Sequence, residues 1–349
     1  MLKCRLSAVL MLAIGVVVTV SIRAEPNTVT VNAISHHECL VLESKLRIFS
    51  AVTNGNQIVA TAERGWLVVY DNIGRPQWCV NVTASADITL TDIMSLGGGE
   101  AIVVGHLGYA ARLTLGNATD QNNEFNVHVL RLADTGAATN KFFKLASAGE
   151  AGTLVVGSFG VIQSWTDRYA PRAPVSFSDA DDFAPHLFGV AALPSGDMLV
   201  VGEQGAILLF DVTRGGVTES RRTPYGGSLF GVEVTADGAV AYGIDGQIVL
   251  IADGLSELQE VDHDLGQISF YASKMLPDGR VVIGGERGGI VLLNNNGGII
   301  SCRSEQRVSI VAFVNLIDNR LLAFTSGGRY SLRFDSDAAC PKWSHEASR

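Results

Sequence analysis

The chain has 349 residues, of which 47% are hydrophobic and 17% are charged; 38 are glycine, and the formal net charge is −9. A glycine-rich and weakly charged composition is typical of a hairpin-rich globular β-protein rather than of a disordered chain. The acidic balance argues against nucleic acid or an anionic membrane surface as the partner, because both select a basic patch.

The first 24 residues are expected to be a secretory signal peptide. Lys3 and Arg5 precede an apolar run at residues 6–20, and the small residue Ala24 ends the segment. The run is short for a membrane span, which favours cleavage and export over an uncleaved anchor. Removal takes away Lys3, Arg5 and Arg23 and no acidic residue, so the net charge changes from −9 to −12. The mature protein is therefore expected to be periplasmic, in a Gram-negative cell, or secreted.

Copies of one stretch run through the rest of the chain, and residues 187–210 (LFGVAALPSGDMLVVGEQGAILLF) are the clearest copy. The stretch has three short apolar runs separated by two turn signals, as in antiparallel strands joined by hairpins. Its second turn glycine recurs at spacings of 43, 52, 45, 41, 42 and 40 residues, at Gly65, Gly108, Gly160, Gly205, Gly246, Gly288 and Gly328. Seven copies of about 40 residues predict an all-β fold, a seven-bladed β-propeller of four-stranded antiparallel blades.

The propeller is expected to span residues 46–341 as one domain. Residues 25–45 are expected to complete the last blade, since propellers commonly close with a strand from the N-terminus, and residues 342–349 are expected to be a frayed tail. The spacing of 52 residues places a polar insertion at 117–126. The proline-rich stretch 170–186 is either a long loop between blades or an extended outer strand.

Four cysteines follow the signal peptide, namely Cys39, Cys79, Cys302 and Cys340, and an even number in an exported chain favours disulfides. The repeat register puts Cys79 and Cys302 in outer strands. If residues 25–45 lie in blade seven, Cys39 and Cys340 lie there together. The pairing of Cys39 with Cys79 and of Cys302 with Cys340 is favoured because it links neighbouring blades. The alternative is a Cys39–Cys340 disulfide with two free thiols.

We expect no catalytic residue, cofactor or bound metal. Asp179, Asp181 and Asp182 lack the ligand spacing of a calcium loop. Residues 36–39 (HHEC) resemble metal ligands, but adjacent residues of a strand face opposite sides and no second cluster completes a tetrahedral site. The glycine-rich segment 284–289 is not followed by a helix that could hold phosphate. The tryptophans are expected to be packing residues.

The second turn of each copy places two residues before the recurring glycine. These pairs are expected to form a ring of side chains on one face of the propeller, where loops on a rigid scaffold often carry function. The candidate partner-binding residues are Glu63, Arg64, His106, Glu203, Gln204, Asp245, Glu286 and Arg287. The alternative explanation is that the turns are polar only because they are in water.

The pattern at 187–210, repeated from Leu229 and Ile268, resembles the photosystem II stability/assembly factor-like family of seven-bladed propellers, within the wider group that has BNR or Asp-box-like repeats. The resemblance covers roughly residues 46–335 and is best in blades four to six, although the Asp box is degenerate, as in DVTRGG at 211–216. It implies an exported, non-catalytic scaffold that binds a protein partner and aids the assembly or stability of a membrane or envelope complex. In photosynthetic organisms that complex is photosystem II. We expect a monomer.

Two other functions are open. The wider group includes sialidases, so a glycan-binding or glycan-acting propeller is the first alternative. A convergent pocket of Arg, Glu, Asp and Tyr side chains would favour it. The second is a quinoprotein-like dehydrogenase, suggested by DNIGRPQW at 71–78. That pattern occurs in one blade only, so it ranks last.

Overall fold

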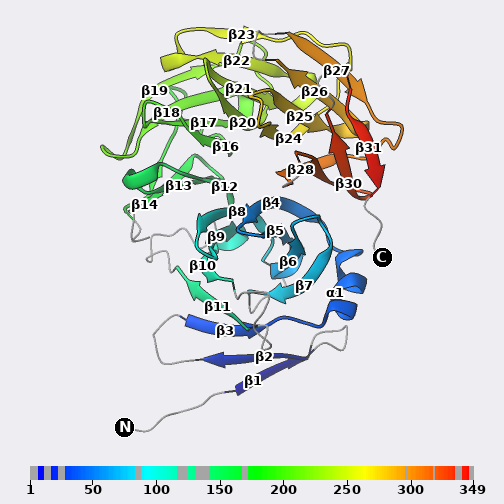
Figure 1. The fold of residues 1–349 in the computed structure, drawn as a ribbon. Helices are drawn as coiled ribbons and strands as arrows, with labels where there is room; N and C mark the ends of the chain where they lie inside the picture. Colours follow the sequence, from blue (N-terminus) through cyan, green and yellow to red (C-terminus); the bar gives the residue numbers. More distant parts are fainter. Residues whose placement is uncertain are drawn as a thin grey trace. The chain divides into compact units, whose positions relative to one another are not determined.

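The computed structural model describes residues 7–11, 17–22, 28–83, 88–115, 124–130, 141–166, 172–294, 298–316, 319–334 and 340–345. Its strands confirm the all-β fold predicted from the repeats, a seven-bladed propeller with four-stranded antiparallel blades. The chain divides into two compact units, residues 1–139 with 348–349 (unit 1) and residues 140–347 (unit 2). Unit 1 contains blades one and two, and unit 2 contains blades three to seven (Figure 1).

In unit 1, the strands of each blade pair in chain order. They are β4 (Ile48–Asn54), β5 (Gln57–Ala62), β6 (Trp66–Asp71) and β7 (Pro76–Asn81) in blade one, and β8 (Leu90–Gly97), β9 (Glu100–Gly105), β10 (Ala110–Thr114) and β11 (Glu124–Val129) in blade two. The two blades bury a shared apolar cluster that includes Val59, Leu67 and Val103. Because β11 begins at Glu124, the end of the insertion expected at 117–126 is strand; residues 117–123 lie outside the described residues.

The N-terminal segment belongs to unit 1, so the expectation that residues 25–45 complete the last blade is wrong. β3 (Thr28–Asn32) pairs antiparallel with β11, and β2 (Val17–Ile22) and β1 (Ser7–Met11) extend the same sheet. An outer strand offers unpaired N–H and C=O groups, which accounts for the pairing of β3 with β11. β1 and β2 lie within the expected signal peptide, whose cleavage stays a prediction.

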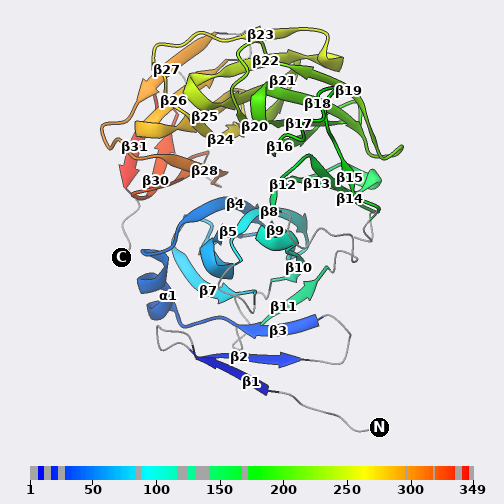
Figure 2. The ribbon, with the colours of Figure 1, turned by 180° about the vertical axis from the view of Figure 1, so that it is seen from behind.

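Helix α1 (His36–Glu43) follows β3 and lies beside β7 in both views (Figures 1 and 2). It occupies the stretch around Cys39 that we expected to be strand. A capping box begins the helix, because the Ser35 hydroxyl accepts from the Glu38 N–H and the Glu38 carboxylate accepts from the Ser35 N–H at 3.1 Å. These bonds satisfy two N–H groups that a helix start leaves without partners.

Replacement of the cap, Ser35→Ala, is expected to lower the free energy of unfolding by about 1 kcal/mol, because one N–H at the helix start loses its acceptor. Chemical denaturation checks this. The control is Ser35→Asp, which keeps a capping oxygen and is expected to retain most of the wild-type stability. Equal losses in the Ala and Asp variants would show that the cap does not stabilise α1.

Unit 2 repeats the same four-stranded blade five times. Its strands are β12 (Phe142–Ser147), β13 (Thr153–Gly157), β14 (Val161–Trp165) and β15 (Val175–Ser176) in blade three; β16 (Leu187–Ala192), β17 (Met198–Gly202), β18 (Ala206–Asp211) and β19 (Gly216–Arg222) in blade four; β20 (Leu229–Thr235), β21 (Gly238–Gly243), β22 (Ile248–Ala252) and β23 (Leu258–Glu260) in blade five; β24 (Phe270–Met275), β25 (Val281–Gly285), β26 (Gly289–Leu293) and β27 (Ile299–Arg303) in blade six; and β28 (Ile310–Asn315), β29 (Leu321–Thr325), β30 (Gly328–Arg333) and β31 (Lys342–His345) in blade seven.

Two stretches of unit 2 differ from or refine the predictions. Strand β31 is the fourth strand of blade seven, so residues 342–345 are not a frayed tail; residues 346–349 lie outside the described residues. A C-terminal strand that follows β30 can pair with it directly, which leaves no place in blade seven for residues 25–45. The proline-rich stretch 170–186 contains the two-residue outer strand β15 and a loop.

The core of unit 2 lies between consecutive blades. Separate apolar clusters fill the spaces between blades three and four, four and five, five and six, and six and seven. Trp165 is fully buried, and Trp66 in unit 1 is only 2% exposed. Both values agree with the expectation that these tryptophans are packing residues. Apolar β-branched runs such as those of β17 and β18 are suited to strands buried on both faces.

Both favoured disulfides are present, Cys39–Cys79 in unit 1 and Cys302–Cys340 in unit 2. The pairing is confirmed, although Cys39 reaches Cys79 from helix α1 and not from a strand of blade seven. Two disulfides are typical of an oxidising environment outside the cytoplasm. Among the described residues, no helix has both the length and the apolar character needed to cross a lipid bilayer.

Candidate functional site

The candidate partner-binding residues lie in the turn between the second and third strands of each blade. In blade four, Gln204 and Gly205 have positive φ angles of 54° and 68°, and the Ala206 N–H donates to the Glu203 carbonyl. This is the backbone of a type I′ turn, centred one residue later than the expected Glu203-Gln204 pair. Glycine is needed at 205 because a Cβ there would also lie 2.2 Å from the Thr223 Oγ1.

The turn backbone recurs in blades one to six and exposes its first central residue. These residues have φ between 53° and 58° and are Arg64, Leu107, Phe159, Gln204, Asp245 and Arg287. The residue before them is half-buried at Glu63, His106, Glu203 and Glu286. In unit 2, the structure therefore brings the candidate residues to the same end of blades four, five and six. Glu63, Arg64 and His106 occupy the corresponding turns of unit 1.

Two turn carboxylates accept hydrogen bonds from tyrosine hydroxyls. Tyr225 donates to Asp245 at 2.8 Å, and Tyr271 donates to Glu286 at 2.7 Å. The hydrogen bond to Asp245 raises the pKa of Tyr225, while burial and then the hydrogen bond to Glu286 raise the pKa of Tyr271. Both hydroxyls therefore stay protonated at neutral pH. Because these donors are neutral, the bonds bring no positive charge to offset the carboxylates.

A β-bulge recurs at the start of the first strand in all seven blades, where the register between the first and second strands slips. In blades three to six the extra residue is aromatic in each blade, namely Phe143, Phe188, Phe230 and Tyr271. A bulge takes its extra residue out of the regular alternation and re-aims the side chain. The residues immediately before them are fully buried, namely Phe142, Leu187, Leu229 and Phe270. Of the bulged side chains, Phe143, Phe188 and Phe230 are half-buried, and Tyr271 is 36% exposed.

The four bulged side chains form a continuous row of rings, which we call the aromatic row (Phe143, Phe188, Phe230 and Tyr271). Successive ring centroids lie 5.3, 5.6 and 5.7 Å apart, within the range of favourable aromatic contact. The residues come from β12, β16, β20 and β24, which contact one another in that order in unit 2 (Figure 1). The row thus crosses four consecutive blades.

His186 joins the aromatic row to the turns. Its ring centroid lies 6.1 Å from those of Phe143 and Phe188, and 4.8 Å from that of Phe159, a turn residue that is 61% exposed. The Nδ1 of His186 accepts from the Phe159 N–H at 3.0 Å. Its backbone N–H donates to the Glu203 carboxylate at 3.1 Å. The row and the turns of blades three to six therefore form one surface that is both apolar and acidic.

The aromatic row has a signal in the sequence that our predictions did not use. The first apolar run of a copy begins with two adjacent apolar residues, as in Leu187-Phe188 and Leu229-Phe230. Both faces of a blade pack against neighbouring blades, so strand alternation does not say which of the two residues is exposed. That depends on the bulge, which takes the second residue of the pair out of the regular register.

The acidic stretch 179–182 closes a loop beside this surface. Asp179 accepts from the N–H groups of Asp181 and Phe183 at 2.9 and 3.0 Å and forms an ion pair with Arg222. Arg222 also donates to the Gln204 side chain at 2.7 Å. Within the described ranges, no group of three or more His, Cys, Asp or Glu side chains is placed to hold a metal ion. The expected absence of a metal stays a prediction.

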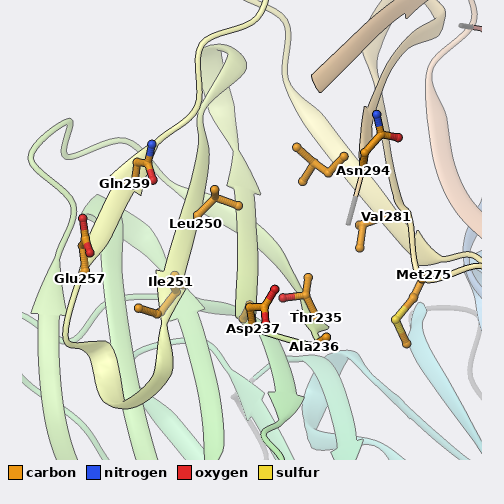
Figure 3. Close-up of a pocket in the computed structure, with 14 residues that line it drawn as sticks. Thr235, Ala236, Asp237, Leu250, Ile251, Glu257, Gln259, Met275, Val281 and Asn294 are labelled. Carbon is orange, nitrogen blue, oxygen red and sulfur yellow. The ribbon is translucent and has the colours of Figure 1, made fainter. Parts of the chain in front are cut away.

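A cavity of about 340 Å³ lies at the other end of blades five and six, away from the turns (Figure 3). Val281 and Leu293 contribute to its apolar lining, and Asp237 and Glu257 are its acidic residues. Met275, 43% exposed, lies on the same strand as Tyr271 but at the cavity end. None of the predicted site residues lines this cavity, so it supplies control positions for tests of the turn surface.

Comparisons with known proteins support the fold and assign no family. No protein-family model matches the chain, and no curated protein matches it. Among solved structures, the WD40 beta propeller domain of Doa1 is similar, with a TM-score of 0.65 and 12% sequence identity over 85% of this chain and 95% of that chain. At this identity the likeness shows the fold alone. β-Propellers commonly serve as protein-binding scaffolds, but a fold by itself does not select a function.

Proposed function

We propose that this protein is an exported, non-catalytic propeller that binds a protein partner through the aromatic row and the adjoining turns of blades three to six. The observation that supports the proposal most directly is the row itself. Four aromatic residues occupy the same bulged position in consecutive blades, with ring centroids 5.3 to 5.7 Å apart. The rings are partly accessible, the neighbouring Phe159 is 61% exposed, and contiguous accessible apolar surface on a folded protein is a mark of an interaction site.

The chemistry of the row suits a protein partner better than a glycan. Aromatic side chains are enriched at the centre of protein interfaces, where they contribute much of the binding free energy. Three of the four rings are phenylalanine, which offers no hydrogen bond to a sugar hydroxyl. The polar groups stand beside the row, as the rim of an interface does. A glycan-binding propeller remains the second candidate, since exposed rings can also stack on sugars.

The finer function rests on the sequence resemblance and on the disulfides. We propose that the protein works outside the cytoplasm as a monomer, that it has no nucleic-acid partner, and that it aids the assembly or stability of a membrane or envelope complex. The acidic composition and the two disulfides support export and a partner other than nucleic acid. The photosystem II assembly factor-like family supplies the suggestion of an assembly role.

The test is capture of a partner from detergent-solubilised native membranes, with the wild type compared with Phe188→Ala/Phe230→Ala. Truncation of two central rings is expected to weaken recovery of a stoichiometric protein by about thirtyfold, as expected for loss of about 2 kcal/mol at a hot spot. The control is Met275→Ala, which is expected to recover the partner as the wild type does. Met275 lies on β24, as Tyr271 does, but at the end that lines the cavity.

Unchanged thermal unfolding of both variants would show that the blades stay folded. Equal recovery of the partner by the wild type and the double ring variant would refute this face as the binding site. Binding to a glycan array that the ring variant loses, with no protein recovered, would favour the second candidate.

A further inference from the structure

We infer that the segment of the partner that contacts the aromatic row is an extended peptide in which lysine or arginine alternates with apolar residues. This inference rests on the proposed function and adds the chemistry of the partner. It follows from two properties of the same surface: the turn carboxylates have neutral hydrogen-bond donors, and the rings of the row are partly accessible.

Among the described residues, the turn carboxylates of blades four to six accept hydrogen bonds only from neutral donors, so these bonds do not offset their negative charge. Asp245 and Glu286 accept from tyrosine hydroxyls, and Glu203 accepts from the backbone N–H of His186. All three donors are neutral. Each carboxylate can accept further hydrogen bonds, because an ionised carboxylate has about four acceptor positions. A lysine or arginine side chain of a partner can therefore bind each one.

Two arginines, Arg222 and Arg287, also lie in this part of unit 2 and bear on the charge of the surface. Arg222 is already committed to the Asp179 carboxylate and to the Gln204 side chain. Arg287 is an exposed cation next to Glu286. Unit 2 as a whole has 24 acidic and 16 basic residues, a net charge of −8. A field of this sign draws a basic segment toward the surface and repels an acidic one.

The rings provide the apolar half of the recognition. A cation over the face of an aromatic ring is attracted by the negative face of the π system, so the row can hold basic as well as apolar side chains. Phe188, Phe230 and Tyr271 lie on blades four to six, the blades whose turns carry the three carboxylates. Three steps of 5.3 to 5.7 Å give the row, measured along its course, a length of at most about five residues of extended chain. A short extended segment can therefore cover the row.

The experiment measures the affinity of the mature protein for three synthetic nine-residue peptides by isothermal titration calorimetry. The first alternates lysine with phenylalanine and leucine, the second has glutamate in place of lysine, and the third has serine in place of the apolar residues. The first is expected to bind at least tenfold more tightly than the other two. Failure of the first peptide to bind, or equal affinity for the first and second, would overturn the inference.

The protein variant is Glu203→Gln/Asp245→Asn/Glu286→Gln, which removes the three charges and keeps the side-chain shapes. It is expected to weaken binding of the first peptide about tenfold and to reduce the dependence of the affinity on salt. The matched control, Asp237→Asn/Glu257→Gln/Glu260→Gln, removes three exposed charges elsewhere on blade five and is expected to bind as the wild type does. Equal losses in the two triple variants would show non-specific attraction and overturn the inference.

Capture of the native partner separates this inference from the proposed function, when the ring variant Phe188→Ala/Phe230→Ala is compared with Glu203→Gln/Asp245→Asn/Glu286→Gln, the turn charge variant. If Phe188→Ala/Phe230→Ala loses the native partner while the turn charge variant retains it fully, the surface binds a protein and the basic character of the segment is refuted. If the ring variant retains the native partner, the proposed function itself fails at this face.

Discussion

Removal of the Cys39–Cys79 disulfide in a Cys39→Ala/Cys79→Ala variant is expected to lower the free energy of unfolding by about 4 kcal/mol, the entropic effect of opening a loop of this length. The two residues are 40 apart in the sequence, and both are fully buried. The disulfide joins helix α1 to β7 and so holds the N-terminal segment on blade one. Chemical denaturation under oxidising conditions measures the loss.

The control is Cys302→Ala/Cys340→Ala, which opens a loop of 38 residues in unit 2. Loop length alone predicts nearly equal losses for the two disulfides. Limited proteolysis distinguishes them, because only the Cys39→Ala/Cys79→Ala variant is expected to be cleaved faster between β3 and β4. A loss below about 1 kcal/mol, with no new cleavage there, would show that β3 and the packing of α1 hold the segment without the disulfide.

Gly202→Ala is expected to lower the free energy of unfolding by about 3 kcal/mol, the upper part of the range for overpacking in a core. The φ of Gly202 is −166°, which any residue adopts, so backbone strain is not the cause. A Cβ at this position would lie 2.3 Å from the carbonyl oxygen of His186. That carbonyl accepts from the Glu203 N–H at 2.8 Å, so it cannot move away without loss of the bond.

The matched control is Gly216→Ala in the same blade. A Cβ on Gly216 meets no atom within 4 Å, and this position also has no positive φ. The control variant is expected to unfold within about 0.5 kcal/mol of the wild type, as surface substitutions usually do. Because His186 contacts the aromatic row, Gly202→Ala is also expected to weaken partner binding. Equal stabilities of the two variants would contradict the steric explanation.

The two glycines of the repeated turn show why the fold could be predicted from the sequence. Gly202 is needed because the carbonyl of His186, the residue before the first strand of the blade, lies against it. Gly205 is needed because its backbone is left-handed. Both requirements arise within one blade. The position of Gly205 is glycine in all seven copies, and the position of Gly202 is glycine in blades two to six, with Ala62 and Thr325 in its place in blades one and seven. Short apolar runs, turn glycines and a period near 40 residues are therefore local signals, and together they specify a four-stranded blade repeated seven times.

The N-terminal segment could be predicted only in part. The structure confirms the predicted cysteine pairing, but residues 36–43 form a helix that begins with the Ser35–Glu38 capping box. The repeat register does not hold for residues 25–45, because they are not a copy of the repeat. The choice between β31 and the N-terminal segment for blade seven depends on which strand reaches the edge of β30, and no local pattern encodes that choice.

The candidate site shows the same division. The blades, their turns and the polar and charged residues that the turns carry could be predicted, since these depend on residues close together in the chain. The row of Phe143, Phe188, Phe230 and Tyr271, with Glu286 bonded to Tyr271, could not be predicted, because it forms only in the folded chain. Each aromatic is about 40 residues from the next. Their contact depends on a bulge in each first strand and on the packing of one blade against the next, which are properties of the folded chain.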